Sequence, residues 1–530
     1  MVPLFVAIAI PPVRASNRSE ELMRNLLAIS LVSMLAMGGV AGAADRTAPT
    51  PAPAQATLPA SGFDAGLTDA QIERLSAEAF YWGLNIAGFY ELRYVFTQFE
   101  GQPAFRGVNR MQPSDKLMDA SVRYATTVNA STLYSGGAFD VSREPVVIEA
   151  PAVTDRRYWS VQAADQNANW FMMVGSQFTG NDAQRYIIVG PHWRGTIPAE
   201  FKSTQIYRAT SNSFTLAARV AVTDRGASDM AAARKVVHGV RAAPLSLWKA
   251  NGGHLPPLAE QPIVKGTYRH FPRMRQIVDY GRTMTASDYL QLLSLAINDP
   301  AITKRGDSVR EVGVLKELSK LGLREGVLFD PAKLTSEQAA AAQAGFNAAR
   351  KKAKAALEAS LVDMNGWRLQ SSLFHNDLDY VAKAGSDDVA WGTPVPYQSH
   401  TIAYIFRDST GQLLDGNKRY TITFDLAKMP PVTEFWELPV YDSAGYFIPN
   451  PIDRYSTTSY QVAAGAFAET NGKVTFYLQA DRPAEPEQVR NWLPTAKGDN
   501  FQLAARFYGP MAPLIDGTYP MPRIVLNKGK

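Results

Sequence analysis

NWLPTAKGDNFQLAARFYGP, the stretch from Asn491 to Pro510, decides the fold of the C-terminal region. Its second half alternates with the period of a strand that has one buried face. The apolar positions on that face are Phe501, Leu503, Ala505 and Phe507. Proline and glycine at the two ends suit strand margins and turns. We interpret the stretch as a long strand of an antiparallel sheet, and its punctuation as structural rather than catalytic.

Two further segments of the C-terminal region show the same alternation. RYTITFDL starts at Arg419 and KVTFYLQA starts at Lys473, and each places aromatic or branched apolar residues at every second position. The second segment follows Asn471-Gly472, which is the strongest short signal for a two-residue hairpin turn. Three such strands with matching turns predict a β-sandwich or jelly roll over residues 398–530.

The N-terminal region carries a second β pattern. From about Val146 the apolar period becomes two, in the runs VVIEA, YWSVQAAD, YIIVG and FTLAARVAV. In the last run, Thr215 and Arg219 point away from the apolar face. A helix is expected before these strands, because TDAQ at Thr68 is a capping-box sequence. We therefore expect an N-terminal β domain over residues 65–270.

Residues 271–397 have the pattern of a helical insert and connector. An Ala-rich segment, entered at Thr335 and stopped near Gly366, predicts one long helix. This helix has one apolar stripe and is otherwise charged, so we expect the insert to be structural and to lack the functional site. The predicted fold class is mainly β with a helical insert, with two antiparallel β-sandwich or jelly-roll-like domains.

The first 43 residues predict export. Residues 24–43 combine a charged start, an apolar run and an Ala-Gly-Ala end, which is the pattern of a secretory signal. We take Met23 as the true start and expect cleavage after Ala43, because the apolar run is too short to span a membrane. Residues 44–64 are rich in Pro and Ala and predict a linker. The mature protein is expected to be soluble, without a membrane span, and periplasmic or secreted.

Composition argues against several functional classes. The chain has 530 residues, 46% of them hydrophobic, a formal net charge of +5 and no cysteine. Such a weak positive charge argues against nucleic acid as a partner, and the lack of cysteine excludes disulfides and thiolate chemistry. No phosphate loop, His-Glu-x-x-His or Gly-x-Ser-x-Gly motif occurs. His375, Asp377 and Asp379 alternate, but we interpret them as a surface turn and predict no metal site.

Several segments carry a family resemblance. LDGNKRYTITF, PPVTEFWELPVYDSAGYFIPNPIDRYS and NWLPTAKGDNFQLAARFYGP resemble the domain of unknown function DUF1214. VNASTLYSGGAFDVSREPVVIEAP, RRYWSVQAADQNANWF and YIIVGPHWRG are similar to DUF1254, its usual N-terminal partner. The resemblance covers roughly residues 70–527. It implies two β-sandwich-like domains with a helical insert, often in exported bacterial proteins, and it implies no activity. The family usually has an aspartate where this chain has Ser131.

Two N-terminal segments concentrate polar and aromatic side chains. DQNANW would place Asp165, Asn167 and Asn169 on one face of a strand, next to Trp170. It fails as a calcium loop, because Trp170 stands where the turn glycine belongs. The other segment runs from Asn129 to Tyr134, and the side chains of these two residues can donate hydrogen bonds to a ligand or accept them from it. We predict Asp165 as a catalytic residue; the predicted ligand-binding residues are Asn129, Tyr134, Asn167 and Trp170. A strand end with a solvated polar face is the alternative.

The C-terminal region offers a second group. FWELPVYD and NPIDRYS bring tryptophan, carboxylates, arginine and tyrosines, including Glu437 and Tyr441, onto neighbouring segments. Such a set can bind a glycan or act as an acid/base pair. We predict Asp453 as a second catalytic residue; the predicted ligand-binding residues here are Trp436, Arg454 and Tyr455. The alternative is that residues 453 and 454 only pair with each other at a strand start.

Two functions of different class remain open. The first is a periplasmic hydrolase or lyase that acts on a carbohydrate or another polar small compound. The second is a non-catalytic protein that binds a carbohydrate or small ligand. Two carboxylates within about 5–10 Å in one cleft favour the enzyme, whereas exposed tryptophans without such a pair favour the binding protein. The sequence names no cofactor and leaves homo-oligomerisation open.

Overall fold

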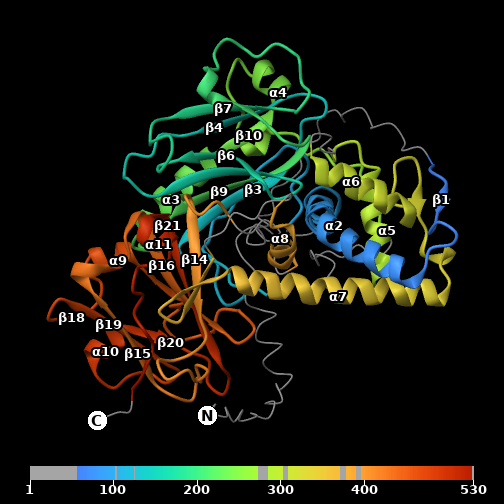
Figure 1. The fold of residues 1–530 in the computed structure, drawn as a ribbon. Coiled ribbons are helices and arrows are strands. Elements are labelled where there is room, and N and C mark those ends of the chain that lie inside the picture. Colours follow the sequence, from blue (N-terminus) through green and yellow to red (C-terminus); the bar gives the residue numbers. More distant parts are fainter. Residues whose placement is uncertain are drawn as a thin grey trace, which may run out of the picture.

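The chain forms two β-sandwiches and a layer of helices beside them (Figure 1). A computed structural model describes residues 57–101, 104–123, 126–271, 284–302, 308–370, 378–388 and 395–527. The expected signal region, residues 1–43, lies outside these ranges. The sheets are mainly antiparallel, so the predicted fold class is confirmed.

The N-terminal sandwich consists of a five-stranded and a four-stranded sheet. The five-stranded sheet has the order β2 (Gln112–Pro113), β3 (Thr132–Asp140), β9 (Ser213–Ala221), β5 (Trp159–Asp165) and β6 (Trp170–Gly175). The four-stranded sheet has the order β10 (Arg241–Pro244), β4 (Val146–Ala150), β7 (Gln184–Val189) and β8 (Ile206–Arg208). Alternate residues of both sheets, such as Leu216 and Ile148, share one buried core. Two helices complete this part, α3 (Ala227–Gly239) and α4 (Leu245–Ala250).

The C-terminal sandwich also has two sheets. The six-stranded sheet has the order β12 (Val362–Met364), β13 (Trp367–Gln370), β14 (His400–Ile405), β21 (Phe501–Pro510), β16 (Val432–Asp442) and β17 (Ser456–Thr458). The second sheet contains β18 (Glu469–Thr470), β19 (Lys473–Gln479), β15 (Tyr420–Asp425) and β22 (Val525–Leu526), with β20 (Trp492–Pro494) parallel to β19. Three short helices accompany them: α9 (Ser459–Ala463), α10 (Pro486–Arg490) and α11 (Ala512–Ile515).

The local predictions for this sandwich are confirmed. The opening stretch supplies β20, a turn and β21, and Phe501, Leu503 and Phe507 lie in the core between the two sheets. Asn471 and Gly472 have φ of 52° and 71° and join β18 to β19, as a type I′ hairpin turn requires.

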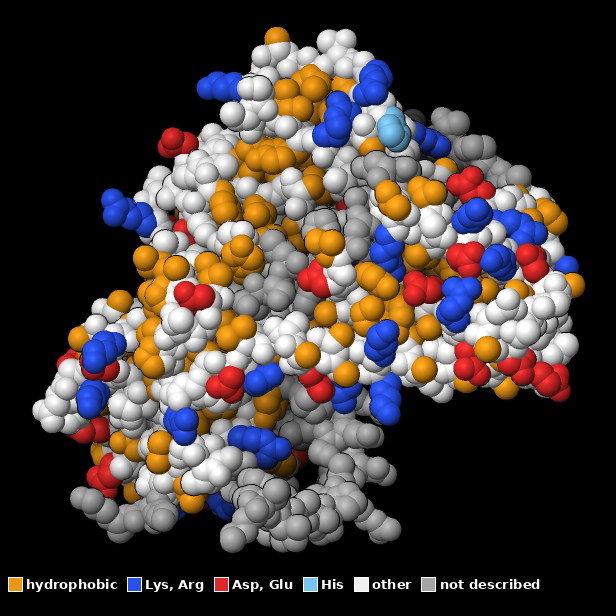
Figure 2. All heavy atoms as spheres, viewed as in Figure 1, with side chains coloured by type: hydrophobic (Ala, Val, Ile, Leu, Met, Phe, Trp, Pro, Cys, Tyr) orange, Lys and Arg blue, Asp and Glu red, His pale blue; other side chains and the backbone are white. Residues whose placement is uncertain are grey.

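The helical layer is built around one long helix, α2 (Asp69–Gln98). Thr68 caps it in a capping box, and Thr335 caps α7 (Ser336–Ser360) in the same way, so both predicted helix starts are confirmed. The other members are α5 (Ala286–Ile297), α6 (Val309–Leu318) and α8 (Tyr380–Asp387). A parallel pair of short strands, β1 (Ala60–Ser61) and β11 (Leu328–Phe329), lies at the edge of this layer. Charges of both signs are interspersed over its visible face, as expected for a solvated surface (Figure 2).

Helix α2 is buried on all sides over its second half. Every residue from Trp82 to Thr97 is buried, and the helix packs against α5, α7 and α8. A helix that is apolar all round belongs inside a protein or inside a membrane. Across the described parts of the chain, no helix combines the length and hydrophobicity that crossing a membrane requires. The helical layer and the sheets around α2 bury it in the structure.

The packing of α8 on α7 depends on Gly385. A Cβ atom at this position would lie 2.3 Å from the carbonyl oxygen of Ala353 on α7. We expect Gly385→Ala to lower the free energy of unfolding by about 1–3 kcal/mol, since the two helices must move apart. Gly313→Ala on α6 is the control, because its Cβ would meet no described heavy atom within 4 Å. It should raise the free energy by up to about 1 kcal/mol. Equal urea midpoints for the two variants would contradict the close approach.

Candidate functional site

A pocket opens where α2, α6 and α8 meet the end of β5. Its cavity volume is about 20 Å³, which is room for one or two water molecules, and it opens towards solvent. Its lining combines aromatic rings, amides and charged groups: Tyr81, Trp82, Asn85, Asn167, Ser308, Arg310, Glu311, Tyr380, Lys383 and Asp387. We call it the α2–α8 pocket. The composition of this lining is that of a site for a small polar ligand.

Asp165 fixes the turn through which the N-terminal sandwich contributes to the pocket lining. Strand β5 ends at this residue, and Oδ1 of Asp165 accepts the backbone N–H groups of Asn167 and Asn169, both at 2.8 Å. Its other oxygen accepts from Thr210 Oγ1 at 2.6 Å. Ala168 takes a φ of 55°, which turns the chain. The expectation that 165, 167 and 169 share one strand face is therefore wrong, because the strand stops and a turn carries Asn167 to α2. There the Asn167 carbonyl accepts Asn85 Nδ2 at 2.7 Å.

Helices α2, α6 and α8 add a guanidinium and aromatic rings to the lining. Arg310 lies 3.5 Å above the ring centre of Tyr380, and Glu311 accepts the indole N–H of Trp82 at 3.2 Å. Burial, with help from the nearby Glu78 charge, raises the pKa of the Tyr81 hydroxyl to about 12. That hydroxyl therefore stays protonated at neutral pH and can donate a hydrogen bond.

Helix α8 also adds an acid beside an amine to the lining. Lys383 and Asp387 lie one turn apart on α8, with Nζ 3.7 Å from Oδ2 and side chains only 5% and 3% exposed. Burial raises the pKa of Asp387 to about 7, although the Lys383 charge opposes this. Among the described residues, Oδ1 of Asp387 and Oδ1 of Asn85 have no hydrogen-bond partner. The pocket therefore offers a carboxyl group that changes protonation state near neutral pH and two oxygens ready to accept hydrogen bonds.

A second polar region, the interdomain layer, lies between the two sandwiches. The five-stranded N-terminal sheet and the six-stranded C-terminal sheet face each other there. Asn129 Nδ2 donates to the Tyr508 hydroxyl at 2.6 Å, and Gln162 donates to Ser399. The ring of Tyr158 lies 5.0 Å from that of Tyr508. Both sheets are thus buried on both faces, one against its partner sheet and one against the other sandwich.

Two buried arginines occupy equivalent places in this layer. Arg219 on β9 and Arg506 on β21 each follow Leu-Ala-Ala, so the same pattern occurs in both sandwiches. Arg219 donates to Gln162 and lies 5.6 Å above the ring of Tyr134. Arg506 donates to the carbonyl of Thr127. Burial lowers the pKa of His400 well below its usual value, and both guanidinium charges add to this. His400 is therefore neutral at physiological pH.

The buried carboxylate of the interdomain layer comes from Glu437. It lies opposite Arg506 in the β16–β21 register, and its Oε1 accepts the backbone N–H of Ala130 at 3.1 Å. Burial raises its pKa, while the Arg506 charge opposes the shift. Ser131, at the position where the resemblance implies an aspartate, donates to Asn129 Oδ1. Glu437 of the C-terminal sandwich thus brings a carboxylate to the segment around Ala130.

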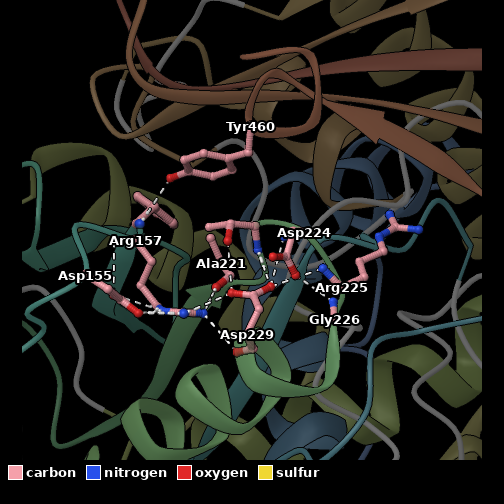
Figure 3. A network of polar contacts seen from close by, with 10 residues as sticks. Asp155, Arg157, Ala221, Asp224, Arg225, Gly226, Asp229 and Tyr460 are labelled. Carbon is pink, nitrogen blue, oxygen red and sulfur yellow. Dashed lines mark hydrogen bonds and ion pairs between the residues drawn. The ribbon is translucent and has the colours of Figure 1, made fainter. Parts of the chain in front are cut away.

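A network of ionic contacts holds the edge of the layer (Figure 3). Asp229 accepts the backbone N–H groups of residues 223–225 and lies 2.9 Å from Arg157. Arg157 also binds Asp155 at 2.6 Å. The turn that Asp229 fixes directs Arg225 to the carbonyl of Ala130 and to Ser456 Oγ, on β17 of the C-terminal sandwich. The network therefore fastens the two sandwiches together.

The structure divides the residues predicted for the site among several places. Asn167 lines the pocket, Asp165 holds its turn, and Asn129 and Tyr134 belong to the interdomain layer. Trp170 begins β6 and packs half-buried against the core cluster that contains α2. The N-terminal candidates thus surround the junction of the sheets with α2 but do not form one cluster.

The C-terminal candidates lie away from the pocket. Trp436 is buried in the sandwich core, where its ring stacks 5.3 Å from Phe424. Asp453 is exposed and accepts the Tyr455 hydroxyl at 3.0 Å. Arg454 donates to two main-chain carbonyls, of residues 490 and 492. His375 and Asp377 lie outside the described residues, and within those residues no group of three His, Asp or Glu side chains could hold a metal ion.

Sequence reasoning missed the pocket residues of the helical insert. Glu311, Lys383 and Asp387 come from α6 and α8, whereas the Ala-rich helix α7 supplies none of the lining. One signal was present: α8 contains Lys383 and Asp387 at i and i+4 in an otherwise uncharged helix. The repeated Leu-Ala-Ala-Arg pattern would likewise have pointed to the interdomain layer.

Two family models match this chain. Residues 108–244 match the model "Protein of unknown function (DUF1254)" and residues 399–512 match "Protein of unknown function (DUF1214)", which confirms the resemblance. No curated protein matches.

The chain is also similar to solved structures. The VPA0106 protein from Vibrio parahaemolyticus aligns with a TM-score of 0.60 at 22% identity, over 86% of this chain and 100% of that one. A putative uncharacterized protein from Burkholderia cenocepacia aligns with a TM-score of 0.39 at 12% identity, over 87% and 93%. The first similarity supports the fold alone.

Proposed function

We propose that this chain, which joins a DUF1254 region to a DUF1214 region, has an enzymatic rather than a purely structural role. The proposed enzyme is a hydrolase or lyase that acts on a carbohydrate or another polar small compound in the α2–α8 pocket. The observation that carries this proposal is the presence of two buried carboxyl groups, Glu311 and Asp387, in one pocket lined by aromatic rings and amides. The secretory pattern of residues 24–43 supports a periplasmic or secreted location.

The proposed mechanism assigns acid/base work to Asp387. A general acid or base is most effective when its pKa lies near the working pH, and the pKa of this carboxyl is raised to about 7. It can therefore give a proton to a leaving oxygen and take one from water or from a carbon acid. Arg310 and Lys383 supply positive charge for an anion that forms during the reaction.

Substrate binding follows from the remaining lining. The rings of Tyr81, Trp82 and Tyr380 offer apolar faces on which a sugar ring or a comparable small molecule can stack. The free Oδ1 of Asn85, within the described residues, can accept a hydrogen bond from a hydroxyl group. A polar ligand with several hydroxyls satisfies these groups better than an apolar one does.

The test combines a ligand screen with matched variants. A thermal-shift screen against sugars, sugar acids and small hydroxy-carbonyl compounds identifies a ligand, because binding raises the melting temperature by mass action. NMR then follows its conversion. Asp387→Asn is expected to reduce turnover at least about a hundredfold, while Glu469→Gln, an exposed acid on β18, leaves it unchanged.

Two outcomes would overturn this assignment. A ligand that binds tightly but is not converted would make the protein a binding protein. A larger loss of turnover in Asp165→Asn than in Asp387→Asn would move the catalytic role to Asp165, the residue first predicted from the sequence.

A further inference from the structure

Lys383 is placed unusually for a lysine. Its side chain is almost fully buried, yet its Nζ is 3.7 Å from Asp387, which is longer than a hydrogen bond. Burying an ammonium group is costly unless the charge is closely paired and hydrogen-bonded. Among the described residues, this Nζ has no hydrogen bond and no shorter ion pair. A structural ion pair is expected to close this distance, whereas an amine that must reach a substrate is expected to keep it open.

We infer that Lys383 is a nucleophile that forms an imine with an aldehyde or ketone bound in the α2–α8 pocket. The inference rests on the proposed function and narrows its substrate class to polar carbonyl compounds. Buried lysines in pockets are the groups that form Schiff bases with carbonyl substrates.

The chemistry balances with the groups present. The Lys383 ammonium gives one proton to the Asp387 carboxylate, and the neutral Nζ attacks the carbonyl carbon. A C–N bond forms while the C=O π bond breaks, and transfer of a proton from nitrogen to oxygen gives a carbinolamine. Asp387 then returns its proton to the hydroxyl, which leaves as water while the C=N bond forms. The product is a protonated imine beside an Asp387 carboxylate. The nitrogen of Lys383 therefore carries a positive charge again, as it did in the ammonium group.

The rest of the pocket suits such a substrate. Arg310 is a cation that can bind a carboxylate or hydroxyl group of the substrate. The protonated imine acts as an electron sink for bond cleavage at the neighbouring carbon, which is the chemistry of a lyase.

Reductive trapping tests the inference on the full chain. The protein is incubated with glycolaldehyde and sodium cyanoborohydride, which reduces an imine to a stable secondary amine. Peptide mass spectrometry then compares the labelling rates of Lys383 and Lys351, an exposed lysine on α7. Lys383 is expected to be labelled at least about tenfold faster despite its burial. Equal or slower labelling of Lys383 overturns the inference, and this comparison needs no variant.

A variant separates this inference from the proposed function. Asp387→Asn should slow labelling of Lys383 about a hundredfold and leave Lys351 unchanged, because only Lys383 uses the acid. An unchanged Lys383 rate in this variant would exclude Asp387 from imine formation and contradict the mechanism. If Lys383 is not trapped, but Asp387→Asn still abolishes turnover of a non-carbonyl substrate, the imine is excluded and the acid/base enzyme stands.

Discussion

Replacing Arg506 with methionine is expected to lower the free energy of unfolding by about 3–5 kcal/mol. Arg506 is fully buried, donates to the carbonyl of Thr127 and lies opposite Glu437. Methionine fills a similar volume but has no charge and no donor. The variant therefore removes the positive charge close to the Glu437 carboxyl and the donor of the hydrogen bond to the Thr127 carbonyl.

A double-mutant cycle distinguishes charge pairing from packing. Arg506→Met combined with Glu437→Gln should lose less stability than the sum of the single losses, since both buried charges are removed together. Arg482→Met, at an exposed position of the same domain, should stay within about 0.5 kcal/mol of the parent. Strictly additive losses in urea denaturation would mean that the two side chains do not act as a pair.

The contribution of Asp387 to the stability of the protein is expected to fall as pH rises from about 4 to 7. The folded pKa of this carboxyl is raised from 3.8 to about 7. Below 3.8 both states are protonated, and between the two values only the folded state keeps its proton. The carboxyl thus contributes stability that is lost as pH rises through this window, up to about 4 kcal/mol.

Asp387→Asn isolates this part, because asparagine does not titrate. The difference in free energy of unfolding, variant minus parent, should increase between about pH 4 and pH 7 and then stay constant. Glu437 and Asp442 also have raised pKa values, mainly through burial, but they are present in both proteins and cancel in the difference. A difference that does not change with pH would show that Asp387 titrates normally in the folded protein.

Local signals in the sequence predicted most of the secondary structure. The capping boxes at Thr68 and Thr335, the Asn471-Gly472 turn and the period-two runs each involve residues close in sequence. Their geometry is fixed by backbone sterics and short hydrogen bonds, so tertiary context did not alter them.

The faces of the strands were harder to predict. Arg219 was expected to point away from the core, which in a single sandwich means solvent. It is fully buried because a second sandwich covers that face. An alternating pattern shows that two faces differ, but it does not show what packs on the polar one.

The candidate site was predicted only in part. Asn167 was named, and it does line the pocket. Glu311, Lys383 and Asp387 were missed, because they reach the pocket through the packing of α6 and α8 on a helix more than two hundred residues earlier in the chain. Such long-range contacts leave no periodic trace in the sequence.

The burial of α2 has a consequence for how the chain reaches its native state. This helix emerges early in synthesis, but its partner surfaces on α7 and α8 belong to residues 336–387. Until those residues are available, the apolar sides of α2 remain exposed. Contacts of such large sequence separation slow folding and expose intermediates to aggregation. A nascent or truncated chain that stops before α7 is therefore a client for holding chaperones, and the sandwiches and the helical layer cannot mature one after another from the N-terminus.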